Sequence, residues 1–259
     1  SAIAQISGTE SNGNQRYDSL QVTLKKRFSY GLEYQAAYTW SHGMSDAIGY
    51  YGEGGGQAAS QSAYWQNLYD RKAEWGPTYF DLRHAFVFSY VYDLPVGRGK
   101  AFGSGWHPVA NYILGNWQMG GILSLQTGFP LTIRATDRSG TISRGARADR
   151  IADGKGAREV GPGKKWLDTD AFRTPAAGTF GNSGNGVVRG PGLKSFSLSI
   201  QKYFPITERH RLEFRGEIYN LTNTPIFGAP NSTVTAATFG EIRGAQGERN
   251  VQLGLKFYF

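Results

Sequence analysis

Long segments of alternating residues constrain this chain more than any other feature of its sequence. In seven segments of ten to thirteen residues, apolar and polar side chains alternate, as they do in a strand with one apolar face. In the last segment, Val251, Leu253 and Leu255 share one face, and Gln252 and Lys256 share the other. Helical periodicity is weak throughout, so the sequence predicts an all-β fold. The seven predicted strands are 17–28, 32–41, 83–94, 115–127, 194–204, 210–221 and 248–259.

The length of these segments favours a membrane barrel. Ordinary strands have about five or six residues. Twelve residues at ~3.3 Å each reach ~40 Å, and a tilt of ~45° lets them cross ~28 Å, the thickness of bilayer hydrocarbon. Aromatic residues such as Tyr17, Phe28, Trp40 and Phe204 lie near the strand ends, as in interfacial girdles. A soluble antiparallel sandwich also shows alternation and remains the alternative fold.

The connections between the predicted strands alternate between short and long. Outer-membrane barrels have short turns on the periplasmic side and long loops outside. We therefore predict one domain over 1–259, an antiparallel up-and-down β-barrel of about seven to eight long strands with short turns on one side. The short connections are 29–31 and 205–209, 95–114 is of medium length, and 42–81, 128–192 and 223–247 are long.

The basic excess of the chain is concentrated in the loop 128–192. The formal net charge is +8, and nine basic against four acidic residues between Arg134 and Lys165 give +5 of it. This pattern fits either a solvated loop with local ion pairs or a contact for an anionic partner such as lipopolysaccharide, an acidic polysaccharide or an anionic ligand. Nucleic acid is not expected, because no aromatic residues interleave with the arginines. The candidate anion contacts are Arg134, Arg138, Arg144, Arg147, Arg150, Arg158, Lys164 and Lys165.

Enzyme motifs are missing from the sequence. The chain has no cysteine, which excludes thiol nucleophiles and thiolate metal sites. Its four histidines form no His-x-x-x-His pair, and Gly99-Lys100 and Gly163-Lys164 lack the spacing of a phosphate-binding loop. We therefore expect a protein that is not an enzyme and that uses no metal or cofactor.

An ordered set of short motifs along the chain carries a family resemblance. It resembles the C-terminal β-barrel region of TonB-dependent outer-membrane receptors, of the type with a carboxypeptidase-regulatory-like N-terminal domain. The motifs include Tyr17-Asp18-Ser19-Leu20, Phe80-Asp81-Leu82-Arg83-His84, Gly115-Asn116-Trp117-Gln118, Gln126-Thr127-Gly128-Phe129-Pro130, Arg189-Gly190-Pro191-Gly192, Asn220-Leu221-Thr222-Asn223 and Gln252-Leu253-Gly254-Leu255-Lys256.

The resemblance implies a bacterial outer-membrane or cell-surface location and a receptor or transporter ancestry. It also implies that Phe259, as a terminal aromatic residue, is a signal for barrel assembly. Complete receptors of this family close a barrel of about 22 strands around a plug. The seven strands and the missing plug of this sequence mean that gated, energised import does not carry over to these residues alone.

Seven antiparallel strands cannot close regularly, because the first and last would meet in parallel. Residues 1–9 within the N-terminal segment 1–15 offer an eighth element, with Ile3 and Ile6 as its apolar residues. If this element completes a neighbour's sheet instead, the chain forms a homopolymer, an extracellular filament or tube. This filament is one alternative function, and a surface adhesin for anionic glycans is the second.

Overall fold

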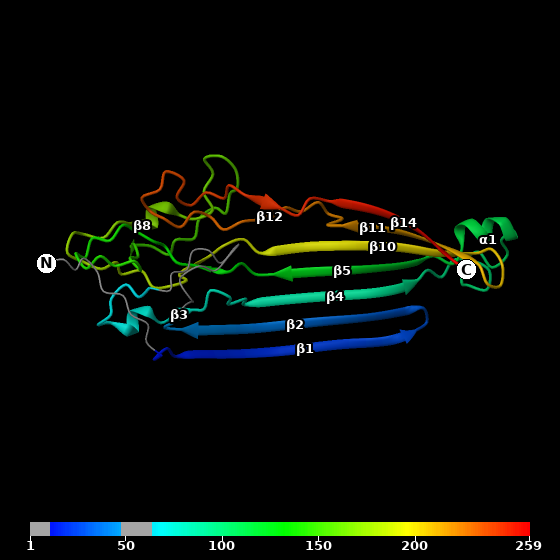
Figure 1. Cartoon of the computed structure of the whole chain (residues 1–259), viewed down its shortest axis with the longest axis horizontal. Helices are drawn as coiled ribbons and strands as arrows, with labels where there is room; N and C mark the ends of the chain where they lie inside the picture. The colour runs from blue at the N-terminus through cyan, green and yellow to red at the C-terminus, as the bar shows by residue number, and fades with distance from the viewer. Residues whose placement is uncertain (1–10, 48–63) are drawn as a thin grey trace.

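One long antiparallel sheet dominates the computed structural model, which describes residues 11–47 and 64–259. Seven long strands follow one another in chain order across it, each antiparallel to its neighbours (Figure 1). They are β1 (Gln15–Ser29), β2 (Leu32–Ser45), β4 (His84–Asp93), β5 (Gln118–Gln126), β10 (Leu193–Pro205), β11 (Arg211–Tyr219) and β14 (Asn250–Tyr258). The all-β prediction and its seven strands are confirmed.

The strand ends differ from the prediction where the backbone leaves the extended conformation. β5 begins at Gln118 rather than at residue 115, because Asn116 has a φ of 58°, in the left-handed region. β2 instead continues past Ser41 to Ser45, where the two-residue strand β3 (Gly76–Pro77) pairs with it.

The sheet is open. Within residues 11–47 and 64–259, β1 pairs only with β2 and β14 pairs only with β11, so the two outer strands do not meet. This is the outcome expected for seven antiparallel strands, whose first and last members run parallel. Closure of the predicted barrel therefore needs further strands at these two edges. Residues 1–10, which include Ile3, Ile6 and the proposed pairing element, lie outside the described residues.

The two ends of the sheet differ as the connection lengths predicted. At one end lie the turn at Tyr30 and Gly31, the turn 206–210, the helix α1 (Pro108–Leu114) and the C-terminus (Figure 1). We call this the turn end. At the other end, the described parts of the long connections fold together, and we call residues 64–83, 127–192 and 220–249 the loop body.

Short elements organise the loop body. Three two-stranded sheets form in it, each from segments that are distant in sequence. They pair β6 (Pro130–Leu131) with β9 (Val188–Arg189), β7 (Asp149–Arg150) with β8 (Phe172–Arg173), and β12 (Ile226–Phe227) with β13 (Ala245–Gln246). Two short 3-10 helices, η2 (Arg71–Glu74) and η3 (Thr169–Ala171), complete it.

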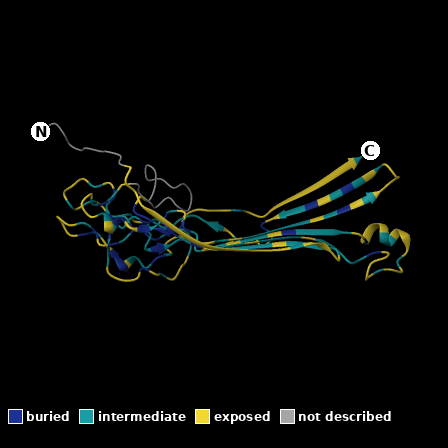
Figure 2. Cartoon of the chain, turned by 90° about the horizontal axis from the view of Figure 1, so that it is seen from below, coloured by how far each residue is buried: buried dark blue, intermediate teal, exposed yellow. Residues whose placement is uncertain are grey.

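The apolar core of the described chain lies in the loop body rather than in the sheet. Figure 2 shows the buried residues gathered mainly there, while the long strands are mostly intermediate or exposed. The connections 127–192 and 220–249 share this core, so they form one folded unit. Its members are Leu131, Ile133, Ala148, Leu167, Ala171, Phe172, Val188 and Phe239.

A substitution in this core tests whether the loop body is a folded unit. Ile133→Ala removes a side chain with 0% exposure and is expected to lower the loop body's unfolding free energy by about 2–5 kcal/mol. Ile151→Ala in the same body is the control, because Ile151 is 57% exposed and the expected cost is below about 1 kcal/mol. Native-state hydrogen exchange of the Ala148 amide, which donates to the Ile133 carbonyl, measures both. Equal effects would contradict a packed core.

Candidate functional site

The strand registers place apolar residues of all seven strands on one face of the sheet. Since side chains alternate along a strand, directly paired residues lie on the same face. We call this surface the apolar face. One complete row across the sheet runs Lys26, Tyr34, Tyr90, Gly121, Leu198, Ile218 and Val251, and the next runs Leu32, Tyr92, Met119, Ile200, Gly216 and Leu253.

Large apolar side chains on this face are left uncovered by the chain itself. Leu253 and Leu255 of β14 are 70% and 71% exposed, and Leu20 and Leu24 of β1 are also exposed. A contiguous apolar surface of this kind marks contact with another apolar phase or partner rather than with water. The span of the strands matches the thickness of bilayer hydrocarbon.

The opposite face, which we call the polar face, carries a ladder of ion pairs on β11. Arg215 lies 2.8 Å from Glu213 and 3.8 Å from Glu217, measured between guanidinium nitrogen and carboxylate oxygen. The Tyr258 hydroxyl donates to Glu213 across the β11–β14 pair at 2.5 Å. The guanidinium of Arg211 lies 4.5 Å from the ring centre of Tyr258. The charged side chains of β11 therefore form neighbouring ion pairs on this face.

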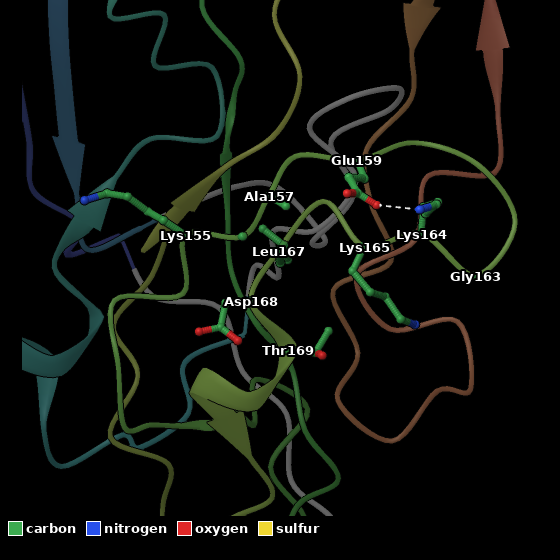
Figure 3. A pocket seen from close by; sticks show the side chains of 10 residues that line it. Lys155, Ala157, Glu159, Gly163, Lys164, Lys165, Leu167, Asp168 and Thr169 are labelled. Atoms are coloured by element: carbon green, nitrogen blue, oxygen red, sulfur yellow. Dashed lines mark ion pairs between the residues drawn. The ribbon is translucent and has the colours of Figure 1, made fainter.

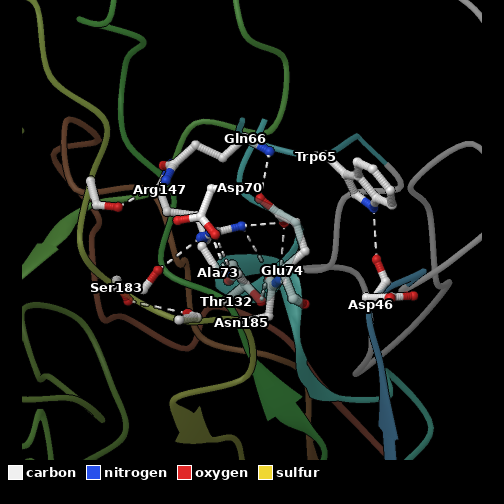
Figure 4. Close-up of polar contacts among 12 residues, drawn as sticks. Asp46, Trp65, Gln66, Asp70, Ala73, Glu74, Thr132, Arg147, Ser183 and Asn185 are labelled. Carbon is white, nitrogen blue, oxygen red and sulfur yellow. Dashed lines mark hydrogen bonds and ion pairs between the residues drawn. The ribbon is translucent and has the colours of Figure 1, made fainter. Parts of the chain in front are cut away.

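A buried ion pair joins two parts of the loop body. Arg147 and Glu74 approach to 2.6 Å with side chains 2% and 1% exposed (Figure 4). Arg147 also donates to the carbonyls of Ser183 and Ala73, at 2.8 and 3.1 Å. The Glu74 carboxylate in turn accepts from the Gln66 backbone amide at 2.9 Å and from the Asn185 side-chain amide at 3.3 Å. Each charge is thus hydrogen-bonded, which a buried pair requires.

A second charged cluster fixes the loop body to the sheet. The buried carboxylate of Asp81, just before β4, accepts from Arg189 of β9 and from the Gly43 amide of β2 at 2.8 Å. Burial alone would raise the pKa of Asp81, but the hydrogen bonds from Arg189, Gly43 and His42 together hold this pKa below its ordinary value. Arg189 also donates to the carbonyls of Asp81 and Gly128, at 3.0 Å each. One arginine thus connects two long loops at the end of the sheet.

Both the helices and the family of this chain bear on how it relates to a membrane. No helix in the described residues is long and apolar enough to cross a membrane. A family model described as an outer membrane beta barrel domain matches residues 1–252. The chain belongs to the outer membrane beta barrel family. This membership supports the predicted outer-membrane location of the barrel domain. No curated protein and no solved structure matches the chain.

The predicted anion contacts of the barrel domain differ in their burial and in their partners. Arg144 lies over the ring of Tyr64, and Arg150 donates to the carbonyls of Ala152 and Asp153. Arg138 and Arg158 are exposed, while Arg134 is half-buried. The prediction that Arg147 contacts an external anion is wrong. Its side chain is buried against Glu74, so it cannot meet an external anion without breaking that ion pair.

The last two candidates, Lys164 and Lys165, lie together with Lys155 around an open hollow of about 540 Å³ (Figure 3). Lys164 pairs with Glu159 at 3.0 Å and Lys165 pairs with Glu241 at 3.2 Å. The hollow therefore has most of its positive charge balanced by the barrel domain's own carboxylates. The local ion pairs of the alternative interpretation are present here.

Two further predictions concern the chain ends and metal sites. Phe259 lies at the turn end with 94% exposure, and its ring stacks on the ring of Phe257 with 6.3 Å between the ring centres. Its role as an assembly signal stays a prediction.

Among residues 11–47 and 64–259, no three His, Asp or Glu side chains are grouped to hold a metal ion.

The sequence did not single out Glu74, Gln66 or Asn185. Their partners are remote: Glu74 and Arg147 are 73 residues apart, and Asn185 and Glu74 are 111 apart. No spacing rule joins residues on separate long loops. The only signal for Asp81 was its place in the family motif 80–84, which gave it no role.

The buried pair gives a prediction for loop-body stability. Glu74→Gln leaves the Arg147 charge buried without its partner, and the expected cost is about 3–5 kcal/mol. Glu159→Gln is the control, because its pair with Lys164 is exposed and contributes less than about 1 kcal/mol. Limited proteolysis of the folded protein at increasing denaturant concentration compares the two. A loop body that resists protease equally in both variants would contradict the structural role of the pair.

Asp81 gives a prediction for pH dependence. Its pKa is lowered in the fold, so its contribution to stability is present above the unfolded value of about 4 and is lost as pH falls through the folded value. Hydrogen exchange at the loop body is expected to show a loss of stability in this acid range. Asp81→Asn is expected to lower stability at neutral pH and to flatten this acid dependence. An unchanged acid profile in the variant would show that other carboxylates control it.

Proposed function

We propose that this chain forms part of the wall and the outer cap of a TonB-dependent-type receptor barrel, which passes a solute across the outer membrane. The observation that carries this proposal is the separation of the two faces across all seven long strands. In this assignment the apolar face meets lipid and the polar face lines the lumen. The role is non-catalytic: the residues described provide a passage and a binding surface.

The open sheet supports a wall that is one part of a larger barrel. Unpaired strand edges are not tolerated in hydrocarbon, because each unsatisfied backbone group there costs several kcal/mol. The free edges of β1 and β14 therefore require strand partners in the membrane. A TonB-dependent receptor barrel of about 22 strands would supply such partners at both edges. The strand direction and register of this sheet are compatible with that continuation.

The polar face supports a passage for a hydrated solute. Its charges are balanced by neighbours on the same sheet, as with Arg215 between Glu213 and Glu217. A surface of paired charges, hydroxyls and amides can exchange hydrogen bonds with a polar solute without binding one ion tightly. The loop body lies at the end of the strands opposite the turns, and in this proposal it forms the outer mouth of the passage, because outer-membrane barrels have their long loops outside.

The filament alternative depends on the same free edges. In it, a segment from another copy of this chain, containing Ile3 and Ile6, pairs with β1 or β14. Electron microscopy of the native membranes distinguishes the two assemblies. Isolated particles embedded in the membrane are expected for the receptor wall. Fibres that are lost when residues 1–9 are deleted would overturn the receptor proposal in favour of the filament.

The adhesin alternative depends on the exposed cations of the loop body. The hollow lined by Lys164 and Lys165 gives it some support, but its neighbouring carboxylates weaken attraction for a polyanion. Binding of an acidic polysaccharide or lipopolysaccharide to intact cells should weaken with added salt if these cations make the contact. Arg138→Gln and Arg158→Gln, at exposed positions, should then reduce the binding, while no binding at low salt would remove this alternative.

Two adjacent residues of β14 test the assignment of the faces. Leu253→Arg places a charge on the apolar face, and the expected loss of folding free energy in lipid is about 2–4 kcal/mol near the bilayer centre. Gln252→Arg is the matched control, because it places the same charge on the polar face opposite Glu217. Urea titration in lipid vesicles measures both. A larger loss for Gln252→Arg would reverse the faces and overturn the proposal.

A further inference from the structure

The helix α1 turns its apolar residues outward. Val109, Ile113 and Leu114 are 61%, 56% and 55% exposed. The polar side chain of Asn111 instead points into the turn, where its carbonyl oxygen accepts from the Arg98 amide at 2.7 Å. A helix on the surface of a water-soluble protein has the opposite arrangement, with apolar residues inside and polar residues outside.

The helix lies on the apolar side of the sheet. Phe204 pairs with Leu212, and Trp117 shares the face of Met119 two residues further along, so both belong to the apolar face. The ring of Tyr112 lies 5.5 Å from the ring of Phe204, and its hydroxyl donates to the Pro205 carbonyl at 3.2 Å. The Trp117 indole donates to the carbonyl of Ile113 at 3.2 Å. The outward residues of α1 therefore continue the apolar face at the turn end.

Lysines mark the place where the apolar face ends. Lys202 is buried beneath α1, where its ammonium donates to the Gly115 carbonyl and lies 5.5 and 5.1 Å from the ring centres of Trp117 and Phe204. Lys26, on the same face, donates to the carbonyls of Ser29 and Leu32 at 2.7 and 2.9 Å. Both side chains carry their charge toward the turn end. Lysines with aromatic neighbours are typical of the boundary between hydrocarbon and headgroups.

We propose that α1 is an interfacial anchor that lies flat in the membrane leaflet at the turn end. Its outward residues enter the boundary between headgroups and acyl chains, about 5–10 Å deep, as amphipathic helices do. The occupant is lipid because the helix surface is continuous with the apolar face and lies at its lysine-marked limit. This inference rests on the proposed function, which assigns the apolar face to lipid. It adds a specific contact with one leaflet that fixes the depth of the sheet.

Nitroxide probes can test this directly, because the sequence has no cysteine and each introduced thiol is unique within it. Single variants Ile113→Cys and Leu114→Cys place the probe on α1. Glu208→Cys in the neighbouring exposed turn is the aqueous control. Leu253→Cys and Gln252→Cys report on the two faces of the sheet. Collisions with oxygen and with a water-soluble nickel chelate, measured by electron paramagnetic resonance in the native outer membrane, give the depth of each probe.

The expected result is a ratio of oxygen to nickel collisions at positions 113 and 114 that is several-fold above that at 208 and below that at 253. A ratio at 113 and 114 equal to that at 208 would place α1 in water and overturn the anchor, while a lipid signal at 253 would leave the receptor wall intact. An immobile probe that neither reagent reaches would show that protein covers α1, which also overturns the anchor. If the probe at position 253 also collides mainly with the nickel chelate, the apolar face lies in water, and the proposed function is overturned together with the anchor that rests on it.

Discussion

Backbone hydrogen bonding in a medium without water is the constraint on which the rest of this structure depends. A strand in hydrocarbon must give every amide and carbonyl to a neighbour, so strand length, direction and register are set together. The long antiparallel ladders of this sheet meet that demand between β1 and β14. The same requirement constrains the side chains, because alternate residues of each strand lie on opposite faces of the sheet and only one of these faces meets the membrane. The free edges of β1 and β14 carry backbone amides and carbonyls that still need hydrogen-bond partners, so these edges are where another strand can pair.

The domain has its ordinary protein core in an unusual place. The sheet leaves its apolar face exposed, and in our proposal lipid covers it, whereas the loop body packs Ile133, Phe172 and Phe239 in one apolar core. The Arg147–Glu74 pair and the Asp81–Arg189 cluster then fix that packed body internally and to the strands. The described parts of the long connections, 64–83, 127–192 and 220–249, therefore make many contacts with one another. They form a folded layer whose interior obeys the rules of a water-soluble domain.

The sheet could be predicted from the sequence because its signal is local. Alternation over ten or more residues identifies a strand and its faces without reference to any partner, and the ladder from Arg211 to Glu217 is visible in the order of residues. Strand ends were harder: Asn116 delays the start of β5 to Gln118 through a backbone angle that alternation does not encode. The loop body could not be predicted, because its ion pairs and hydrogen bonds join residues as much as 108 and 111 positions apart, respectively. The charge run after Arg134 predicted an external contact, but Arg147 serves an internal one.

The shared interior of the loop body has a consequence for how the domain can be altered. Its parts come from three connections that leave and re-enter the sheet at different strands. Modularity, the usual property that lets loops be exchanged one at a time between related barrels, is therefore lost here. A chimera that keeps this cap has to inherit all three connections as a set, together with the Asp81 and Arg189 positions that attach them.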